Sequence, residues 1–247
     1  MGANNSFKKI IMQPLIDDLN KTFKAIPTAE GLQKILDYKF GNIAFSTSLG
    51  QEDQVITDMI FGQKLPIQVF TLDTGRLFEE SWEVYQKTVK KYNQQIQVYS
   101  PNTEAVQKLL TQKGAFSFYD SVENRKECCR VRKVEPLQRA LQNVNVWITG
   151  LRAEQSNHRQ KLQLFSYDDA FGLIKFNPLA HWTLEEVEHY LEQHKVPQNS
   201  LHQKGFKSIG CAPCTRAIQP DEDIRAGRWW WENSKKECGL HLQNSAS

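Results

Sequence analysis

Hydrophobic residues recur along this chain with two periods, one typical of helices and the other of strands. Short apolar runs predict four buried strands, at residues 42–45, 67–71, 95–99 and 144–149. Between these runs, apolar residues spaced three and four apart predict helices, at residues 13–38 with a break near Pro27, 53–61, 78–92, from about 103, 128–141 and from about 183. Helices that alternate with strands indicate an α/β fold with a doubly wound, mostly parallel sheet.

The last part of the chain differs in composition from the rest. After Cys214 the sequence becomes polar and charged, apart from three consecutive tryptophans. We therefore expect one domain over residues 1–217 and an appended C-terminal segment over residues 218–247.

Overall charge and hydropathy exclude few functions, but they favour a small anionic ligand over nucleic acid or a membrane as the binding partner. A net charge of +3 over 247 residues fits an anionic small molecule, and no dense run of Lys and Arg favours nucleic acid. The N-terminus lacks the pattern of a signal peptide, and no apolar stretch approaches the length of a membrane span. We expect a cytoplasmic protein with no membrane partner, and a homo-oligomer stays open.

Three polar loops follow predicted strands, at residues 46–53, 72–77 and 150–156. In an open α/β sheet, ligands bind at the carboxyl ends of the strands, so these loops are expected to line one crevice. Ser46 and Ser48 offer hydroxyl groups, Gly50 lets backbone amides approach, and the next helix begins with a partial positive charge. Each loop alone would suit an ordinary turn, but the three together favour a nucleotide pocket. The sequence Gly-Lys-Ser/Thr of a Walker A loop is missing.

The five cysteines divide into two close pairs and one remaining residue. Cys128 and Cys129 are adjacent, Cys211 and Cys214 form a C-x-x-C, and Cys238 lies near the C-terminus. In a reducing compartment, paired cysteines favour metal or redox chemistry over structural disulfides. The two pairs are therefore candidate metal ligands.

An iron–sulfur cluster and zinc both fit four thiolates. Adjacent cysteines are awkward donors to one small tetrahedral ion, whereas a cubane cluster offers each thiolate its own iron. The spacing favours a cluster over zinc, and a vicinal disulfide or four inert core thiols stay open.

Cys238 is a candidate nucleophile, because a cysteine near Lys, Arg and His can have a lowered pKa. His241 follows it by three residues and could assist a thiolate or an anion. An idle exposed thiol and a surface histidine are the ordinary alternatives.

Other basic and aromatic residues accompany the cysteines. Lys133 lies four residues after Cys129 and would share a helix face with it, although alone it would suit a solvated lysine. Arg225 and Arg228 would share a helix face or be exposed. The three tryptophans at 229–231 could stack on bases, but packing of the tail against the domain explains at least one or two of them better.

Taken together, these motifs resemble those of the assimilatory adenylyl-sulfate reductases, relatives of the phosphoadenylyl-sulfate reductases. The resemblance extends from about Phe40 to His241. It is carried by F-S-T-S-L-G-Q-E-D-Q-V, T-L-D-T-G-R-L-F, E-C-C-R-V-R-K-V-E-P-L, I-T-G-L-R-A-E-Q-S, C-A-P-C-T-R and E-C-G-L-H. The Cys-Cys pair followed by Cys-x-x-C and Cys-Gly-Leu-His is the most specific part.

The resemblance implies a fold like that of the adenine nucleotide α-hydrolases and a [4Fe–4S] cluster on the paired cysteines. It implies that Lys133 bridges the cluster and the substrate region, and that Cys238 is the nucleophile. Other matched positions are assigned to substrate, at Ser46, Ser48, Leu72, Thr74, Gly150, Arg152, Arg225, Arg228 and His241. One departure from the family lies at residues 49–51, where many relatives have a different order of small residues.

The activity implied is reduction of adenylyl sulfate to sulfite and AMP through a Cys238 thiosulfonate, in sulfate assimilation and cysteine biosynthesis. The electron donor is expected to be a separate thioredoxin-type protein, because no thioredoxin-like domain follows Cys238. Two alternatives stay open. One is a reductase for the 3′-phosphorylated substrate, or for both substrates, and the other is a non-catalytic, metal-stabilised module that binds nucleotides or RNA.

Overall fold

The computed structural model describes residues 2–155 and 159–232, with side chains described from residue 10 onward. The chain forms two compact units. The first contains residues up to 71, 83–97 and 141–199, and the second contains 72–82, 98–140 and the described residues from 200 onward. The division between residues 217 and 218 stays a prediction.

A six-stranded sheet has the strand order β3-β2-β1-β4-β6-β5. The strands are β1 (Ile43–Thr47), β2 (Gln68–Leu72), β3 (Gln97–Tyr99), β4 (Val146–Ile148), β5 (Phe165–Asp168) and β6 (Leu173–Phe176). β1 pairs in parallel with β2 and β4, β4 pairs in parallel with β6, and only β5 is described as antiparallel to its neighbour. The predicted mostly parallel α/β sheet is confirmed, but the β5–β6 hairpin was not predicted.

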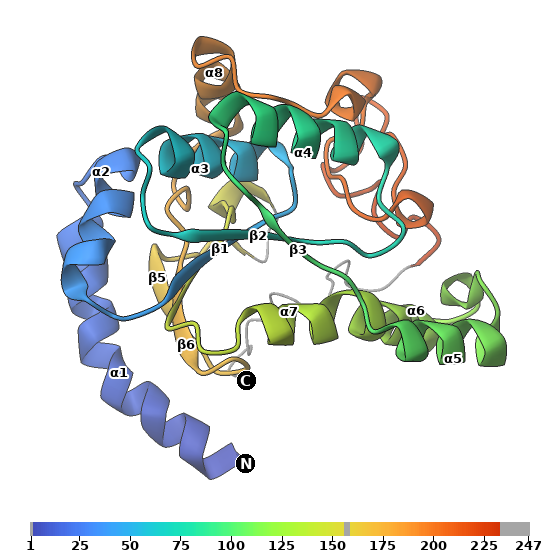
Figure 1. The fold of residues 1–247 in the computed structure, drawn as a ribbon, viewed down its shortest axis with the longest axis horizontal. Helices are drawn as coiled ribbons and strands as arrows, with labels where there is room; N and C mark the ends of the chain where they lie inside the picture. Colours follow the sequence, from blue (N-terminus) through green and yellow to red (C-terminus); the bar gives the residue numbers. More distant parts are fainter. Residues whose placement is uncertain (1, 156–158, 233–247) are drawn as a thin grey trace. The chain divides into compact units, whose positions relative to one another are not determined.

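Helices of the first unit pack an apolar core against this sheet. They are α1 (Gly2–Phe23), α2 (Thr28–Lys34), the short 3-10 helix η1 (Ile35–Tyr38), α3 (Gln51–Gly62) and α8 (Leu184–Gln193). A further 3-10 helix of this unit, η4 (Ala153–Gln155), has no buried residue. α4 (Glu79–Tyr92) continues from the second unit into the first. Figure 1 shows α3 and α8 together, and the two helices contact each other. The predicted break at Pro27 is confirmed, since this residue is the N-cap of α2.

Aromatic stacking fills the part of the core next to the hairpin. Phe165 and Phe176 stack with ring centroids 4.3 Å apart, and Phe23 packs edge-on against Phe165 at 4.9 Å. All three side chains are buried. The predicted helix start near residue 183 is also confirmed, because Thr183 and Glu186 form a capping box, in which each side chain accepts the other's backbone N–H, at the start of α8.

The second unit is built from helices and loops. Its elements are α5 (Thr103–Lys113), η2 (Ser117–Tyr119), α6 (Val122–Cys129), η3 (Arg130–Val134), α7 (Glu135–Ala140), η6 (Ser200–Lys204) and η7 (Ala212–Cys214). Figure 1 shows α5 beside the run from α6 to α7, and α5 contacts η3 within that run.

The prediction that Cys128 and Cys129 open a helix is wrong. Helix α6 already begins after Ser121, whose side chain accepts a hydrogen bond from the backbone N–H of Asn124. The two cysteines therefore end α6, and a π-helical turn, η3, follows them. Pro136 has no N–H to donate to the carbonyl of residue 132, so regular α geometry is interrupted there.

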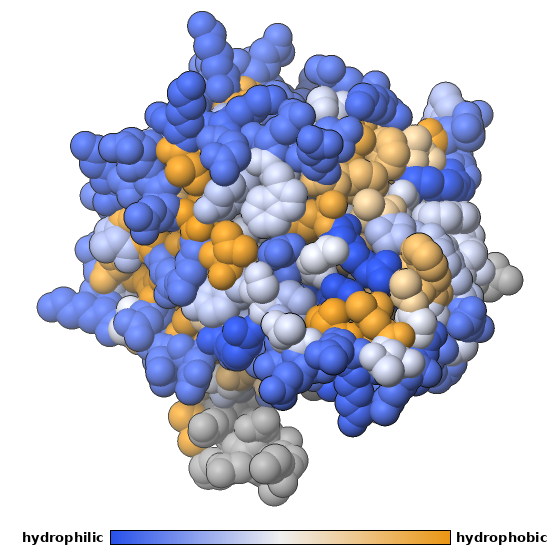
Figure 2. Space-filling view, turned by 45° about the vertical axis from the view of Figure 1, so that its right-hand side comes forward, coloured by the Kyte–Doolittle hydropathy of each residue, from blue (hydrophilic) through white to orange (hydrophobic). Residues whose placement is uncertain are grey.

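Among the described residues, no helix is long and apolar enough to cross a membrane. The face seen in Figure 2 is mostly hydrophilic, with apolar residues gathered in small separate groups.

Candidate active site

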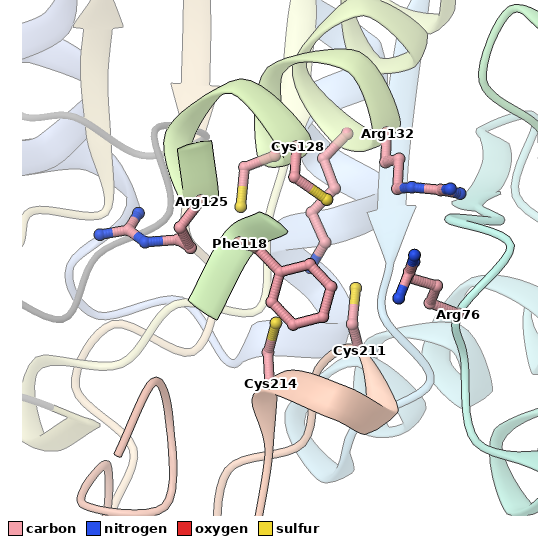
Figure 3. Close-up of a pocket in the computed structure, with 9 residues that line it drawn as sticks. Arg76, Phe118, Arg125, Cys128, Arg132, Cys211 and Cys214 are labelled. Carbon is pink, nitrogen blue, oxygen red and sulfur yellow. The ribbon is translucent and has the colours of Figure 1, made fainter. Parts of the chain in front are cut away.

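The four paired cysteines line one small pocket of the second unit, although they are far apart in the sequence. The other lining residues are cationic or aromatic, namely Arg76, Phe118, Arg125, Arg132 and Lys133. Figure 3 shows Cys128, Cys211 and Cys214 directed toward a common space, with Arg76 and Arg132 on one side and Arg125 on the other. The sequence-based grouping of the two cysteine pairs is thus matched by their positions.

Short backbone contacts place the Cys-x-x-C motif in this pocket. Cys211 precedes the one-turn helix η7, whose backbone N–H at Ala212 donates to the carbonyl of Arg76 at 2.8 Å. The Thr215 hydroxyl donates to the carbonyl of Cys211 at 2.9 Å. The loop after β2 and the turn at η7 are therefore fastened together, and both cysteines are buried.

The local electrostatics differ from one thiol to the next. Burial would raise the pKa of Cys211, but Lys133, a hydrogen bond with Thr74, and further arginines outweigh it, so this pKa is lowered. Burial raises the pKa of Cys214 to about 12, and it also raises the pKa of Cys128. Each of these thiols interacts electrostatically with at least one other cysteine of the pocket.

The donor set of the pocket suits a thiophilic metal group. All four cysteines are free thiols rather than disulfides. Thiolate sulfur selects zinc, Cu(I) or iron–sulfur clusters, and the surrounding cationic side chains would offset negative charge. Within residues 2–155 and 159–232, however, no three His, Cys, Asp or Glu side chains are arranged to hold one metal ion. The four thiols and their cationic neighbours are compatible with a thiolate-bound group such as an iron–sulfur cluster, in which each sulfur binds its own metal atom.

Lys133 and Arg228 occupy buried or half-buried positions near the cysteines. Lys133 lines the same pocket as Cys129. Arg228 is 6% exposed, and its guanidinium donates to the carbonyl of Ile209 at 3.3 Å. Its positive charge acts to lower the pKa values of Cys211 and Cys214. A Cβ at Gly210 would lie 2.6 Å from the Arg228 Cζ, so only glycine leaves room for this guanidinium.

The suggestion that Arg225 and Arg228 share a helix face is wrong. Residues 224–227 form a turn, and Arg228 makes an isolated antiparallel bridge with Thr215. Arg225 is half-buried, and its backbone N–H donates to Asp223 Oδ1 at 2.8 Å. A charge pattern at spacing three was not enough to predict a helix here.

The tryptophans pack as the ordinary alternative predicted. Trp229 is 1 % exposed, Trp231 is half-buried, and Trp230 is 40 % exposed. The Trp231 ring packs against Phe118, and the Trp229 ring lies against the Arg125 guanidinium, while the Trp229 backbone N–H donates to the carbonyl of Cys214.

In the first unit, the loop after β1 is organised by a buried carboxylate. Asp53 Oδ2 accepts from the backbone N–H of Ser48 at 2.5 Å and from its hydroxyl at 2.6 Å. Burial raises the pKa of Asp53 to about 6, although the hydrogen bonds from Ser48 and the backbone of Gly150 lower it. Leu49 carries the left-handed φ of 62° in this loop. The strained position is therefore this leucine and not the neighbouring Gly50, whose φ is −78°.

The loop after β4 meets this first loop closely. A Cβ at Gly150 would overlap the Asp53 carboxylate, so a side chain there would displace the loop. Arg152 is 1 % exposed and donates to Glu52 Oε1 at 2.9 Å and to Glu154 Oε2 at 3.0 Å. The Ser46 hydroxyl accepts from Trp147 Nε1 at 2.8 Å. Two of the three loops expected to form a crevice are thus adjacent, while the pocket they were predicted to form stays a prediction.

The third loop belongs to the second unit. Thr74, predicted to line a nucleotide pocket, is buried, and its hydroxyl lies 3.3 Å from the Cys211 sulfur. Leu72 is half-buried at the end of β2. Thr74 therefore contacts the cysteine pocket directly.

Cys238, His241 and Ser156 lie outside the described residues. Sequence reasoning missed Arg76, Phe118, Arg125 and Arg132 as pocket residues. The two arginines at 125 and 132 carried a usable signal, because each is three or four residues from a cysteine along a helix. Phe118 carried none.

Comparison with known proteins adds a family to this geometry. Residues 42–217 match the family described as "Phosphoadenosine phosphosulfate reductase domain". An adenosine 5′-phosphosulfate reductase of Allochromatium vinosum is 52% identical over 206 residues, which cover 83% of this chain and 80% of that protein. Proteins with the same name from Burkholderia cepacia and Neisseria meningitidis serogroup A are each 48% identical, over 81% and 80% of this chain and 80% and 82% of theirs.

Solved structures agree with the fold. The crystal structure of a phosphoadenylyl-sulfate reductase from Candida auris, in a phosphate complex, aligns with a TM-score of 0.70 and 29% identity, over 82% of this chain and 96% of that one. A yeast FAD synthetase with FAD aligns with a TM-score of 0.50 and 16% identity, over 81% of this chain and 73% of that one, which supports the fold alone.

Proposed function

The chain belongs to the phosphoadenosine phosphosulfate reductase family, and from this membership we propose that it reduces adenylyl sulfate to sulfite and AMP. One observation carries the proposal, namely that relatives about 50% identical over four fifths of the chain are named for this substrate. The four paired cysteines, which line one pocket beside cationic side chains, agree with it.

A [4Fe–4S] cluster is the group that these cysteines would hold, one iron for each of Cys128, Cys129, Cys211 and Cys214. Zinc is less well supported, because the adjacent Cys128 and Cys129 are awkward donors to one small tetrahedral ion. When bound, the cluster would contribute structural order and an electrostatic field, without carrying the electrons of the reaction.

In the first step, the Cys238 thiolate attacks the sulfur of the sulfonyl group. A sulfur–sulfur bond forms, the bond from that sulfur to the phosphate oxygen breaks, and the electron pair leaves with AMP. Lys133, Arg225 and Arg228 are proposed to stabilise the negative charge that develops on the phosphate oxygen. His241 is proposed to assist at the same anion, and Ser46, Ser48, Leu72, Thr74, Gly150 and Arg152 are proposed to bind the nucleotide.

In the second step, a thioredoxin-type dithiol protein regenerates the enzyme. One donor thiolate attacks the Cys238 sulfur of the thiosulfonate, and sulfite leaves with the electron pair. The second donor thiol then resolves the mixed disulfide, so the donor is oxidised by two electrons and Cys238 returns as a thiol. A reduced dithiol donor requires a reducing compartment, which supports placing the protein in the cytoplasm.

Mass spectrometry of the full chain tests the proposal. Incubation with adenylyl sulfate and without reductant should add one sulfonate to the peptide that carries Cys238, and reduced thioredoxin should then release it as sulfite. Cys238→Ser should keep the fold but lose turnover, because serine is a poor nucleophile at neutral pH. An adduct on Cys128 or Cys211, or full activity in Cys238→Ser, would show that the nucleophile is assigned wrongly.

Steady-state kinetics distinguish adenylyl sulfate from the related substrate with a 3′-phosphate. We expect kcat/KM to be higher for adenylyl sulfate, and the ratio of the two kcat/KM values measures the discrimination. A higher value for the 3′-phosphorylated substrate would reassign the chain within its family.

A further inference from the structure

A buried ion pair joins the helix that carries two of the cysteines to the last described residue of the chain. Arg125 Nε and Nη2 donate to Glu232 Oε1 and Oε2, each at 2.9 Å. The two side chains are only 2% and 4% exposed. A bidentate pair of this kind fixes both distance and orientation, unlike an exposed pair of flexible side chains.

Trp229 reinforces the same connection. The Arg125 guanidinium lies 4.8 Å from the Trp229 ring centroid, and the Arg228 guanidinium lies 4.7 Å from it. The Glu232 backbone N–H donates to the carbonyl of Trp229 at 3.0 Å. Trp229 also has a φ of 42°, an unfavourable conformation for a bulky residue, which the surrounding contacts must hold in place.

The pair of Arg125 and Glu232 lies close in sequence both to two of the paired cysteines and to the proposed nucleophile, Cys238. Arg125 lies one helical turn before Cys128 and Cys129, and its guanidinium interacts with the Cys129 side chain as well as with Glu232. Cys238 follows Glu232 by six residues, a stretch that spans at most about 20 Å even when fully extended. Whatever fixes Glu232 therefore limits where the Cys238 sulfur can go.

We propose that Arg125 and Glu232 are positioning residues, which anchor the Cys238 segment to the cysteine-bearing helix α6 so that sulfonate transfer begins from a restricted geometry. The inference rests on the proposed role of Cys238. It assigns neither residue a contact with substrate, and it gives a use to an ion pair that has a high cost of desolvation.

The expected effect is on the rate of sulfonation and not on substrate binding. Loss of the anchor lets Cys238 sample more positions, so fewer of them place the thiolate in line with the sulfonyl sulfur. A misplacement of about 1 Å can slow an oriented reaction on the order of a hundredfold. Glu232→Gln should therefore lower kcat strongly and leave KM for adenylyl sulfate unchanged, and Glu232→Asp should give a smaller decrease.

The main experiment measures single-turnover sulfonation of Cys238 in the anaerobically purified full chain, without a donor. Glu222→Gln is the control for loss of a bidentate pair elsewhere in the same unit, because Glu222 pairs with Arg216, with side chains that are 32% and 36% exposed. That control should sulfonate at the wild-type rate. Visible absorbance per chain and the thermal midpoint are recorded for every variant.

A double variant guards against misfolding of Glu232→Gln, which leaves the buried Arg125 guanidinium uncompensated. Arg125→Met combined with Glu232→Leu removes both charges and keeps the volume, a change that buried pairs often tolerate. It should fold and keep its visible absorbance, yet sulfonate slowly. Limited trypsin digestion gives a readout independent of turnover, because loss of the anchor should speed cleavage after Arg225 and Arg228.

Wild-type sulfonation rates and unchanged trypsin cleavage in the Glu232 and double variants would overturn the proposal. So would a slower rate that merely follows a loss of absorbance or of folded protein, since that indicates a structural role alone. If the wild-type protein itself is never sulfonated on Cys238, the proposed function fails, and the trypsin comparison still decides whether the anchor exists.

Discussion

Asp53 should make the protein less stable as the pH rises from about 4 to about 6. This residue is only 8% exposed, and burial raises the pKa of its carboxyl group from 3.8 to about 6. Between these two values the folded protein holds a proton that the unfolded chain has released. The stabilisation by the neutral carboxyl is therefore complete below the unfolded pKa and is lost as the pH rises through the folded pKa.

The magnitude follows from the size of this shift. The difference between about 6 and 3.8 is roughly 2 pKa units, and each unit corresponds to about 1.4 kcal/mol, so the wild-type protein should lose about 3 kcal/mol. Asp53→Asn removes the titration and keeps the shape of the side chain. The difference in unfolding free energy between this variant and the wild type should therefore change by about 3 kcal/mol across the interval.

Urea unfolding followed by tryptophan fluorescence, at a series of pH values from about 4 to 8, measures this difference. Ser48→Ala should raise the Asp53 pKa further, because it removes the hydroxyl that lowers this pKa and leaves the backbone N–H in place. In this variant, the decrease in unfolding free energy with rising pH should therefore continue to a higher pH than in the wild type. The reasoning is refuted if the difference between Asp53→Asn and the wild type is independent of pH, or if carbon NMR places the Asp53 pKa near its ordinary value.

Three further outcomes are expected. Gly210→Ala should lower kcat/KM on the order of tenfold, because the new Cβ would lie within 3 Å of the Arg228 guanidinium and displace it. Gly62→Ala is the control and should change kcat/KM little, because nothing lies within 4 Å of a Cβ there. Phe165→Ala should lower the free energy of unfolding by about 3–5 kcal/mol in urea titrations, because the stack with Phe176 is lost; a loss below about 1 kcal/mol would show that this part of the core repacks freely. Anaerobically purified wild type should absorb visible light and contain about four irons per chain, and Cys211→Ala should lose both. One zinc per chain in the wild type would contradict a cluster.

Much of the fold was predictable because its signals are local. The break at Pro27 follows from a missing N–H group, and the start of α8 follows from a capping box of four residues. The β5–β6 hairpin was missed because its strands are short and its turn around Gly172 lacks the residue pair typical of tight hairpins. The start of α6 was missed although Ser121 carried a capping signal.

The sequence by itself determined which residue types are present for the chemistry, namely two close cysteine pairs and the basic residues beside them. Only the tertiary structure decided which residues contact them. Thr74 and Cys211 are 137 residues apart, and Arg125 and Glu232 are 107 residues apart. No periodicity encodes such contacts, because they depend on how distant segments pack, and packing is set by the volume and burial of many side chains at once. The same packing gave Asp53 its raised pKa, since desolvation arises only when the surrounding chain excludes water.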